Sequence, residues 1–470
     1  MVFSSITFLV YFLPVFLLVY HLMPHKYKNA VILLASIYFY SWGGPKFVFV
    51  ILGTTFLDFF LVNAMHNQKT QSAKLKFLII SLCLNLGLLF YFKYCNFFIE
   101  NINAVLGTEI SWLKVALPIG ISFYTFESLT YVIDVYRGVH KPLKNFWHYQ
   151  TYILMFPKLI AGPIVRYHDI ADQITNREKN YTPEVKLSGF LIFCIGLAKK
   201  TIIANTLGMQ ADAVFKLAPE QLDTAAAWVG AIAYTFQIYF DFSGYSDMAI
   251  GLAKMMGFRL PENFNNPYTS GSITEFWRRW HITLGAWMKN YLYIPLGGNQ
   301  VSKTKLYRNL FVVFLLSGLW HGASWNFVLW GAYHGLFLVM ERIFLGKFFK
   351  QVGKWVSVPI TFIILITGWV LFRNENISYA MSVIKQMYSI NFVDGKFAMN
   401  NDFIWMAIVA LLISMFTLTD KTTQIQKTFY AEVFSSKGKW YAVFAGIILF
   451  YISLSYVAAL DFNPFIYFRF

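Results

Sequence analysis

Residues 47–65 read FVFVILGTTFLDFFLVNAM, an apolar run that extends from Phe47 to Met65. A helix needs about 20 mainly apolar residues to cross the hydrocarbon core of a bilayer, and this run is long enough to do so. Further apolar runs lie on both sides of it, at Ile6–Met23, Ala30–Tyr40, Phe77–Phe92, Val115–Val135, Ser188–Ala204, Ala225–Phe240, Leu310–Leu319, Trp325–Ile343, Val356–Phe372, Phe403–Phe416 and Trp440–Leu460. The pattern predicts an all-α polytopic membrane protein.

The composition of the chain supports lipid as its solvent. Of the 470 residues, 57% are hydrophobic, 20% are aromatic and only 13% are charged, whereas a soluble domain carries about 25% charged residues. No change in composition marks a soluble domain, so we expect one transmembrane domain over residues 1–470. Trp, Gly, Pro, Arg and His gather in residues 156–335. Polar groups are costly at membrane depth, so we expect the functional core in that segment.

The formal net charge of +16 is distributed among short loops, which favours a role in membrane orientation over nucleic-acid binding. Lys and Arg are kept on the cytoplasmic side of membrane proteins. The basic loops are His25–Lys28, Lys69–Lys76, Arg137–Lys144, Lys303–Arg308, Lys347–Lys354 and Lys421–Lys439. Placing them in the cytoplasm puts both termini outside, which requires an even number of spans. We expect ten spans if the short runs Ala30–Tyr40 and Leu310–Leu319 are broken or re-entrant, and twelve if both cross.

Two further features bear on processing and metal binding. The first apolar run lacks a basic leader and a small-residue cleavage site, so we expect it to be an anchor. Cys83, Cys95 and Cys194 show no CxxC spacing, and neither a metal site nor a disulfide framework is supported.

The first candidate for chemistry is the stretch Ser317–Asn326, which reads SGLWHGASWN. Here an apolar run stops at His321, between Gly318 and Gly322, and a second apolar run follows. Glycine permits a break or a close backbone approach, and a break at membrane depth must be buried or wet. A histidine at such a point can act as a general base on a hydroxyl. The alternative is a histidine that only bonds a backbone carbonyl between helices.

A second histidine, His334, lies 13 positions after His321. On one continuous helix these positions project about 140° apart, at about 100° per residue. If the helix is unbroken, His334 does not share a site with His321, and we interpret it as a packing residue.

The second candidate is Glu275–His281, which reads EFWRRWH and continues to Gly298. As one amphipathic helix at the membrane interface, it would place Trp277, His281, Leu284 and Met288 on one face and Arg278 and Lys289 on another. The basic side chains there could bind the phosphates of an anionic donor. Anchoring to lipid phosphate is an equally good explanation of Arg278 and Arg279, but not of His281 on the apolar face.

Two weaker polar sets lie in apolar runs. Asp241 can meet Tyr245, and Asp247 can meet Ser243, at i,i+4 spacing. Tyr124, Glu127, Tyr131 and Asp134 likewise form one stripe. Both sets could line a tunnel, but hydrogen bonding between helices is the better interpretation. The chain contains no G-x-S-x-G, Walker or HExxH motif, so a serine hydrolase, an ATPase and a zinc protease are unsupported.

Several of these motifs, in this order and spacing, resemble the membrane-bound O-acyltransferase (MBOAT) family, and closely its bacterial branch of alginate O-acetyltransferase membrane subunits. The resemblance is carried by Met1–Ser5, Pro157–Ile164, Asp241–Gly251, Asn263–Phe264 with Pro267–Tyr268, Trp277–His281, Tyr293–Gly298, Trp320–Gly322 and Phe465–Phe470. It implies a ring of tilted helices around a thin centre, where a cytoplasmic tunnel meets an outer funnel.

The resemblance also implies a function and site residues. The near-invariant histidine of the family corresponds to His321, as base or transient acyl acceptor, and a second polar position corresponds to His281. Trp320, Trp325, Asn326 and Trp277 would shape the pocket, and Arg278 and Arg279 would attract the donor. The expected donor is acetyl-CoA, with no bound cofactor or metal. An extracytoplasmic partner protein would pass the acetyl group to a polysaccharide, outside a bacterial cytoplasmic membrane.

Two other classes of function remain open from the residues. A transporter or flippase of a cell-envelope precursor would also use intramembrane carboxylates, but would show paired broken helices and would not depend on one histidine. A scaffold for polysaccharide export would not need His321.

Overall fold

The computed structural model of the protein describes residues 1–112, 114–391, 399, 401–432, 434–460 and 466. They fall into two compact units: unit 1 contains residues 1–193, 248–261 and 432–443, and unit 2 contains residues 194–247, 262–431 and 444–470. The chain passes between the units within α10 (Pro183–Ala198), α12 (Thr224–Met255) and α22 (Ser436–Ala459). Of the terminal motif Phe465–Phe470, only Ile466 is described, and the other five residues lie outside the described residues.

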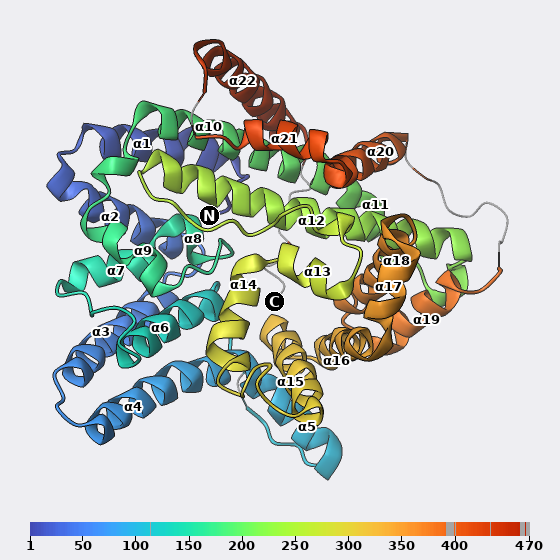
Figure 1. Cartoon of the computed structure of the whole chain (residues 1–470), viewed down its shortest axis with the longest axis horizontal. Coiled ribbons are helices and arrows are strands. Elements are labelled where there is room, and N and C mark those ends of the chain that lie inside the picture. Colours follow the sequence, from blue (N-terminus) through green and yellow to red (C-terminus); the bar gives the residue numbers. More distant parts are fainter. Residues whose placement is uncertain (113, 392–398, 400, 433, 461–465, 467–470) are drawn as a thin grey trace. The chain divides into compact units, whose positions relative to one another are not determined.

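Unit 1 is built from the first helices of the chain, of which the α-helices are labelled in Figure 1. They are η1 (Thr7–Phe12), α1 (Leu13–Leu22), η2 (His25–Tyr27), α2 (Lys28–Ser41), α3 (Phe47–His66), α4 (Gln71–Leu89), η3 (Phe90–Tyr94), α5 (Cys95–Leu106), α6 (Ile121–Tyr136), α7 (Phe146–Leu154), α8 (Phe156–Leu159), α9 (Tyr167–Thr175) and η4 (Glu178–Asn180). Helix α4 packs on both α3 and α6.

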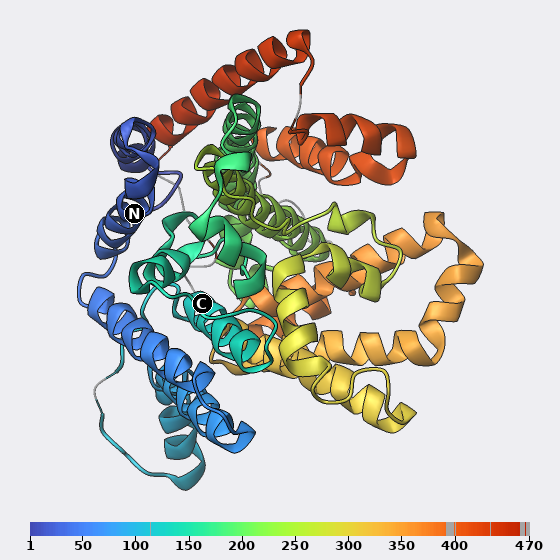
Figure 2. The same cartoon turned by 60° about the vertical axis from the view of Figure 1, so that its left-hand side comes forward.

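Unit 2 holds most of the later helices. They are η5 (Lys199–Ala204), α11 (Asn205–Phe215), η6 (Pro219–Gln221), η7 (Pro267–Thr269), α13 (Ile273–Arg279), α14 (Ile282–Met288), η8 (Lys289–Tyr293), α15 (Lys303–His321), α16 (Trp325–Met340), η9 (Glu341–Leu345), α17 (Gly346–Val352), α18 (Lys354–Arg373), α19 (Ile377–Met387), α20 (Asn401–Met415), η10 (Phe416–Leu418) and α21 (Asp420–Phe429). Figure 2 shows α15, α16 and α18 as the yellow and orange helices that follow one another in this unit.

The all-α membrane fold predicted from the apolar runs is confirmed. Within the described ranges, seven helical segments are long and apolar enough to cross a bilayer, and Thr7–Leu22 is a shorter apolar helix. The described part of the chain contains no strand, only one isolated β-bridge, between Phe264 and Trp280. The short predicted run Ala30–Tyr40 lies on α2, which is 14 residues long. Span number and the single domain stay predictions.

The outer surfaces of these helices are apolar, as lipid requires. Phe49 on α3 is 77% exposed and Leu412 on α20 is 64% exposed. In water, such apolar area would be costly. In a bilayer it faces hydrocarbon, so the surface agrees with a multi-pass membrane protein.

The interiors of both units contain buried ion pairs that hold helices together. In unit 1, the Lys158 ammonium of α8 bonds the Glu127 carboxylate of α6, and both side chains are fully buried. In unit 2, Lys200 lies 2.6 Å from the Asp241 carboxylate of α12. The predicted interhelical role of Glu127 is therefore confirmed, with a lysine as its partner.

Candidate active site

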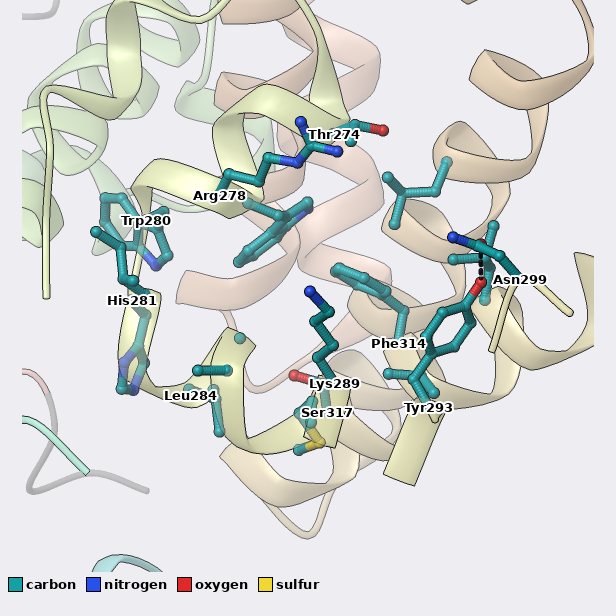
Figure 3. Close-up of a pocket in the computed structure, with 18 of the residues that line it drawn as sticks. Thr274, Arg278, Trp280, His281, Leu284, Lys289, Tyr293, Asn299, Phe314 and Ser317 are labelled. Carbon is teal, nitrogen blue, oxygen red and sulfur yellow. Dashed lines mark hydrogen bonds between the residues drawn. The ribbon is translucent and has the colours of Figure 1, made fainter. Parts of the chain in front are cut away.

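A pocket of about 420 Å³ lies in unit 2 between the α13–α14 segment and α15 (Figure 3). One wall is formed by residues of α13, α14 and η8, and the facing wall by residues of α15. The lining side chains include Thr274, Trp277, Arg278, Trp280, His281, Leu284, Met288, Lys289, Tyr293, Asn299, Leu310, Val313, Phe314, Ser317 and Arg342. The pocket is mostly apolar, with polar groups at a few points, which is typical of sites for small ligands.

The wall formed by α15 is fixed by very close packing against α16. A Cβ atom on Gly318 would lie 2.2 Å from the Phe327 carbonyl oxygen, and one on Gly331 would lie 2.5 Å from the Phe314 carbonyl oxygen. Only glycine permits this backbone approach. Helix α15 ends at His321 and α16 begins at Trp325, so the break predicted from the glycine-flanked histidine is confirmed.

His321 is the last residue of α15 and is 4% exposed. Its imidazole is surrounded by aromatic rings, with centroids 5.0 Å from Trp320, 5.1 Å from Trp330 and 5.2 Å from Phe372. It does not line the pocket, but Ser317, one helical turn before it on α15, does. The pocket therefore ends one turn short of His321.

His281 lines the pocket directly, at the junction of α13 and α14. Its backbone has φ 44° and ψ 54°, in the left-handed region that few residues other than glycine adopt. Pairing with residues 263–265 holds it there: Asn265 N–H donates to the Arg279 carbonyl, and Ile282 N–H donates to the Asn263 carbonyl, both at 2.9 Å. Backbone strain held by surrounding structure is common at functional sites.

The hydrogen bonds of Asn263 fix the protonation of this imidazole. Asn263 Nδ2 donates to Ser246, and its Oδ1 accepts from the Thr283 hydroxyl at 2.9 Å. The same Oδ1 lies 3.1 Å from His281 Nδ1, which must therefore be the donor. Burial lowers the pKa of His281 to about 3, so the ring is neutral near pH 7. Nε2 is then its basic nitrogen.

The pocket is also lined by positively charged side chains, Arg278, Lys289 and Arg342. Lys289 extends between His281 on one side and Tyr293 with Asn299 on the other (Figure 3). Arg278 and Arg342 line both this pocket and an adjoining hollow of about 300 Å³, to which Lys347 and Lys350 contribute. None of these five cations has an ion-pair partner among the residues that the structure describes. Glu341, the acidic residue of the hollow, accepts a hydrogen bond from the Thr274 N–H.

A family model for membrane-bound O-acyltransferases matches residues 67–382 of the chain. The chain belongs to this family. It is 45% identical over 396 residues to a protein named probable alginate O-acetylase from Pseudomonas aeruginosa, across 83% of this chain and 75% of that one. A protein of the same name from Pseudomonas putida is 41% identical across the full length of both chains. A peptidoglycan O-acetyltransferase from Helicobacter pylori is 36% identical across 83% of this chain and 80% of its own.

The site residues expected for this O-acyltransferase are only partly brought together. Trp277, Arg278 and His281 line the pocket, and Trp320 lies behind them, with its ring centroid 6.1 Å from that of His281. The described residues hold no group of three or more His, Cys, Asp or Glu that could bind a metal ion.

Three other expected site residues lie away from the acyltransferase pocket. Arg279 pairs with Glu275 at 2.7 Å. Trp325 starts α16 and is 56% exposed. Asn326 is buried and accepts a hydrogen bond from the Ser324 hydroxyl.

The prediction of one amphipathic helix through Trp277 and Met288 is wrong. The chain turns at His281, whose left-handed backbone separates α13 from α14. Residues assigned to opposite faces of that helix, Leu284 and Lys289 among them, therefore line the same pocket.

The angle of about 140° expected between His321 and His334 assumed one continuous helix. It does not hold, because α15 and α16 are separate helices. The His334 ring lies 5.0 Å from both Trp277 and Trp330, and Trp330 also contacts His321. His334 is fully buried, and neither of its ring nitrogens has a hydrogen-bond partner in the described structure. Its contacts are those of a packing residue.

Lys289 was expected beside Arg278 as a possible phosphate ligand, but sequence reasoning did not assign the cations Arg342, Lys347 and Lys350 to the acyltransferase site. Lys347 and Lys350 belong to the basic loop Lys347–Lys354, which was interpreted only as an orientation signal. The carboxylates of α12 also have partners that were not foreseen: Asp247 lies 2.6 Å from Lys199, and Asp241 pairs with Lys200. These lysines make the carboxylates part of the helix packing.

Proposed function

We propose that this acyltransferase takes an acetyl group from acetyl-CoA on the cytoplasmic side and transfers it outward for O-acetylation of an extracytoplasmic polysaccharide. An extracytoplasmic partner protein completes the delivery. The protein works in the cytoplasmic membrane of a bacterium, with His321 as the catalytic residue and His281 as its support on the donor side.

The course of the pocket along α15 is the observation that carries this proposal. The pocket follows α15 from Leu310 to Ser317, and its opposite end adjoins the basic hollow. Helix α15 has 19 residues and is about 28 Å long, close to the thickness of a bilayer core. Its first turns carry the basic loop Lys303–Arg308, and its last residue is His321. A donor bound from the basic side therefore presents its acyl end toward the histidine.

The basic hollow suits the phosphates of the donor. Phosphate oxygens are strong acceptors for arginine and lysine donors. Arg278, Arg342, Lys347 and Lys350 converge on a space that has Glu341 as its acidic residue, so the net charge favours an anion. The mostly apolar pocket beyond it suits the neutral arm that carries a thioester.

The chemistry requires one base and balances without a cofactor. His321 removes the proton from the acceptor hydroxyl as its oxygen attacks the thioester carbonyl carbon. The new C–O bond forms, the C–S bond breaks, and the histidine returns the proton to the departing thiolate. His281, whose Nδ1 donates to Asn263, has Nε2 as an acceptor for an N–H or O–H group of a substrate.

The relatives indicate the class of acceptor. Their names give alginate and peptidoglycan as acetylated polymers, and a 28% identical relative from Bacillus subtilis is named teichoic acid D-alanyltransferase. Carbohydrate or polyol hydroxyl groups of envelope polymers are common to all three. We therefore propose a polysaccharide hydroxyl as the final acceptor.

Reconstitution of the purified full-length protein in proteoliposomes tests the proposal. Labelled acetyl-CoA is supplied on the face that carries the basic hollow, with the extracytoplasmic partner protein and a panel of oligosaccharides on the other. We expect donor-dependent ester formation by the wild type and none by His321→Ala at equal protein level. Passage of label across the membrane without ester formation, unaffected by His321→Ala, would favour the transporter alternative.

A further inference from the structure

Three cations converge in unit 1, far along the chain from the acyltransferase pocket. Lys28 begins α2, Arg177 lies between α9 and η4, and Lys186 lies in the first turn of α10. Tyr20 at the end of α1 and Tyr181 before α10 lie between them. We call these five residues the cation cluster.

The two lysines of the cation cluster share one aromatic ring. Lys186 Nζ lies 3.5 Å from the centroid of the Tyr181 ring, and Lys28 Nζ lies 4.4 Å from it. Lys28 Nζ also donates to the Tyr20 carbonyl at 2.8 Å and to the Tyr181 hydroxyl at 2.9 Å. Although it is a lysine, Lys28 is only 3% exposed.

Arg177 brings a third positive charge to the same place. Its guanidinium donates to the Tyr20 hydroxyl at 3.1 Å, to Asn29 Oδ1 at 2.7 Å and to the Met256 carbonyl at 3.2 Å. These acceptors are neutral, so they orient the guanidinium without cancelling its charge.

No carboxylate balances the cation cluster in the described parts of the chain, since none forms an ion pair with Lys28, Arg177 or Lys186. Other basic residues of unit 1 are paired, such as Lys439 with Glu184 and Arg259 with Glu432. Burial, together with the charges of Lys186 and Arg177, lowers the pKa of Lys28. Like charges that are partly desolvated repel each other strongly, and a bound anion would relieve that repulsion.

An apolar groove of about 630 Å³ begins next to the cation cluster, between α1 and α2. Val19 and Val31 line it, and they lie within three residues of Tyr20 and Lys28 in the sequence. From there the groove follows Val15 and Ala35 to Tyr11 and Trp42. Its lining is apolar, as an acyl chain requires, and it lies on helices whose outer side chains face lipid.

We propose that the cation cluster and this groove together bind one anionic phospholipid, with its phosphate at Lys28 and Lys186 and an acyl chain between α1 and α2. The basic loop His25–Lys28 belongs to the face that the positive-inside rule places in the cytoplasm. Anionic lipids are abundant in that leaflet, and tyrosine is common at headgroup depth. The lipid ties α1 and α2 to the start of α10, so it stabilises unit 1.

Thermal unfolding of the purified full-length protein in detergent, with added lipid, tests this site. Phosphatidylglycerol should raise the Tm more than phosphatidylcholine does, and soluble glycerol phosphate should have no comparable effect. Lys186→Gln should weaken phosphatidylglycerol binding by about fivefold, since one lysine near an anionic headgroup contributes about 1 kcal/mol. Ala35→Phe should block the groove and weaken binding while leaving every cation in place.

The matched control is Lys26→Gln, which removes a charge from the same loop outside the cation cluster. It should bind phosphatidylglycerol nearly as well as the wild type. Equal stabilisation by both lipids, or equal losses in Lys26→Gln and Lys186→Gln, would overturn the proposal. Stabilisation by glycerol phosphate that Ala35→Phe does not change would also overturn it, because the site would then bind phosphate without a chain.

Discussion

Two adjacent arginines, Arg278 and Arg279, have different surroundings and should therefore behave differently when substituted. Arg278 lines the pocket and the basic hollow, whereas Arg279 is paired with Glu275. A charge that recruits the donor acts in the ground and transition states alike, so Arg278→Gln should raise the donor KM with little change in kcat. We expect about a tenfold effect, near 1.4 kcal/mol.

Arg279→Gln is the control for that measurement, because it removes an equal charge one residue away. Its donor KM should stay within about twofold of the wild type, since an exposed pair contributes about 1 kcal/mol at most and does not face the pocket. If Arg278→Gln lowers protein abundance but leaves the donor KM unchanged, Arg278 anchors the protein to lipid and the donor enters elsewhere.

His281 combines an imidazole with a left-handed backbone, and the two can be separated by substitution. Asparagine tolerates the left-handed region better than most residues, so His281→Asn should preserve the turn between α13 and α14. We expect near-normal membrane abundance and a loss of acetyl transfer by about 10²-fold, because a misplaced substrate reacts more slowly. Wild-type turnover in His281→Asn would show that the imidazole takes no part.

A substitution of His334 tests whether a buried imidazole close to the pocket takes part in acetyl transfer. Its ring packs on Trp277 and Trp330, and its nitrogens have no hydrogen-bond partner in the described structure. Replacing such a group by an apolar one of similar size costs little. His334→Leu should retain most acetyl transfer at normal abundance, unlike His321→Ala. A complete loss of turnover in well-folded His334→Leu would assign the imidazole a chemical role.

At the scale of elements, the buried pair Glu127–Lys158 joins α6 to α8. Removing one partner of such a pair leaves the other charge without compensation and costs about 3–5 kcal/mol. Glu127→Gln should therefore lower the thermal stability of the purified protein. Adding Lys158→Met should restore part of it, because no charge then remains buried. A double variant less stable than Glu127→Gln would contradict this account.

Some elements could be predicted from the sequence and others could not, for a physical reason. The apolar runs predicted the helices, and the glycines around His321 predicted the end of α15, because both signals are local. The turn at His281 depends on backbone bonds to residues 263–265, and helical periodicity carries no trace of such a contact. The basic hollow was missed likewise, since α13 and α17 meet only in the folded chain.

At the scale of the whole molecule, the distribution of basic loops predicts its orientation in the membrane. Lys69–Lys76 and Lys421–Lys439 should be cytoplasmic and both termini outside. A reporter that is active only outside the cytoplasm should work when fused after Phe470, and one fused within Lys69–Lys76 should not. An inactive fusion at Phe470, expressed at a normal level, would contradict an even number of spans.

The glycine contact between α15 and α16 also bears on what moves during a reaction cycle. With the two backbones touching at Gly318 and Gly331, these helices can neither slide nor part without losing that contact. The residue at the end of α15, His321, therefore keeps its position relative to α16. During turnover the acyl group should therefore move past α15 and α16 while the two helices keep their relative positions. No rocking of one of these helices against the other should be needed.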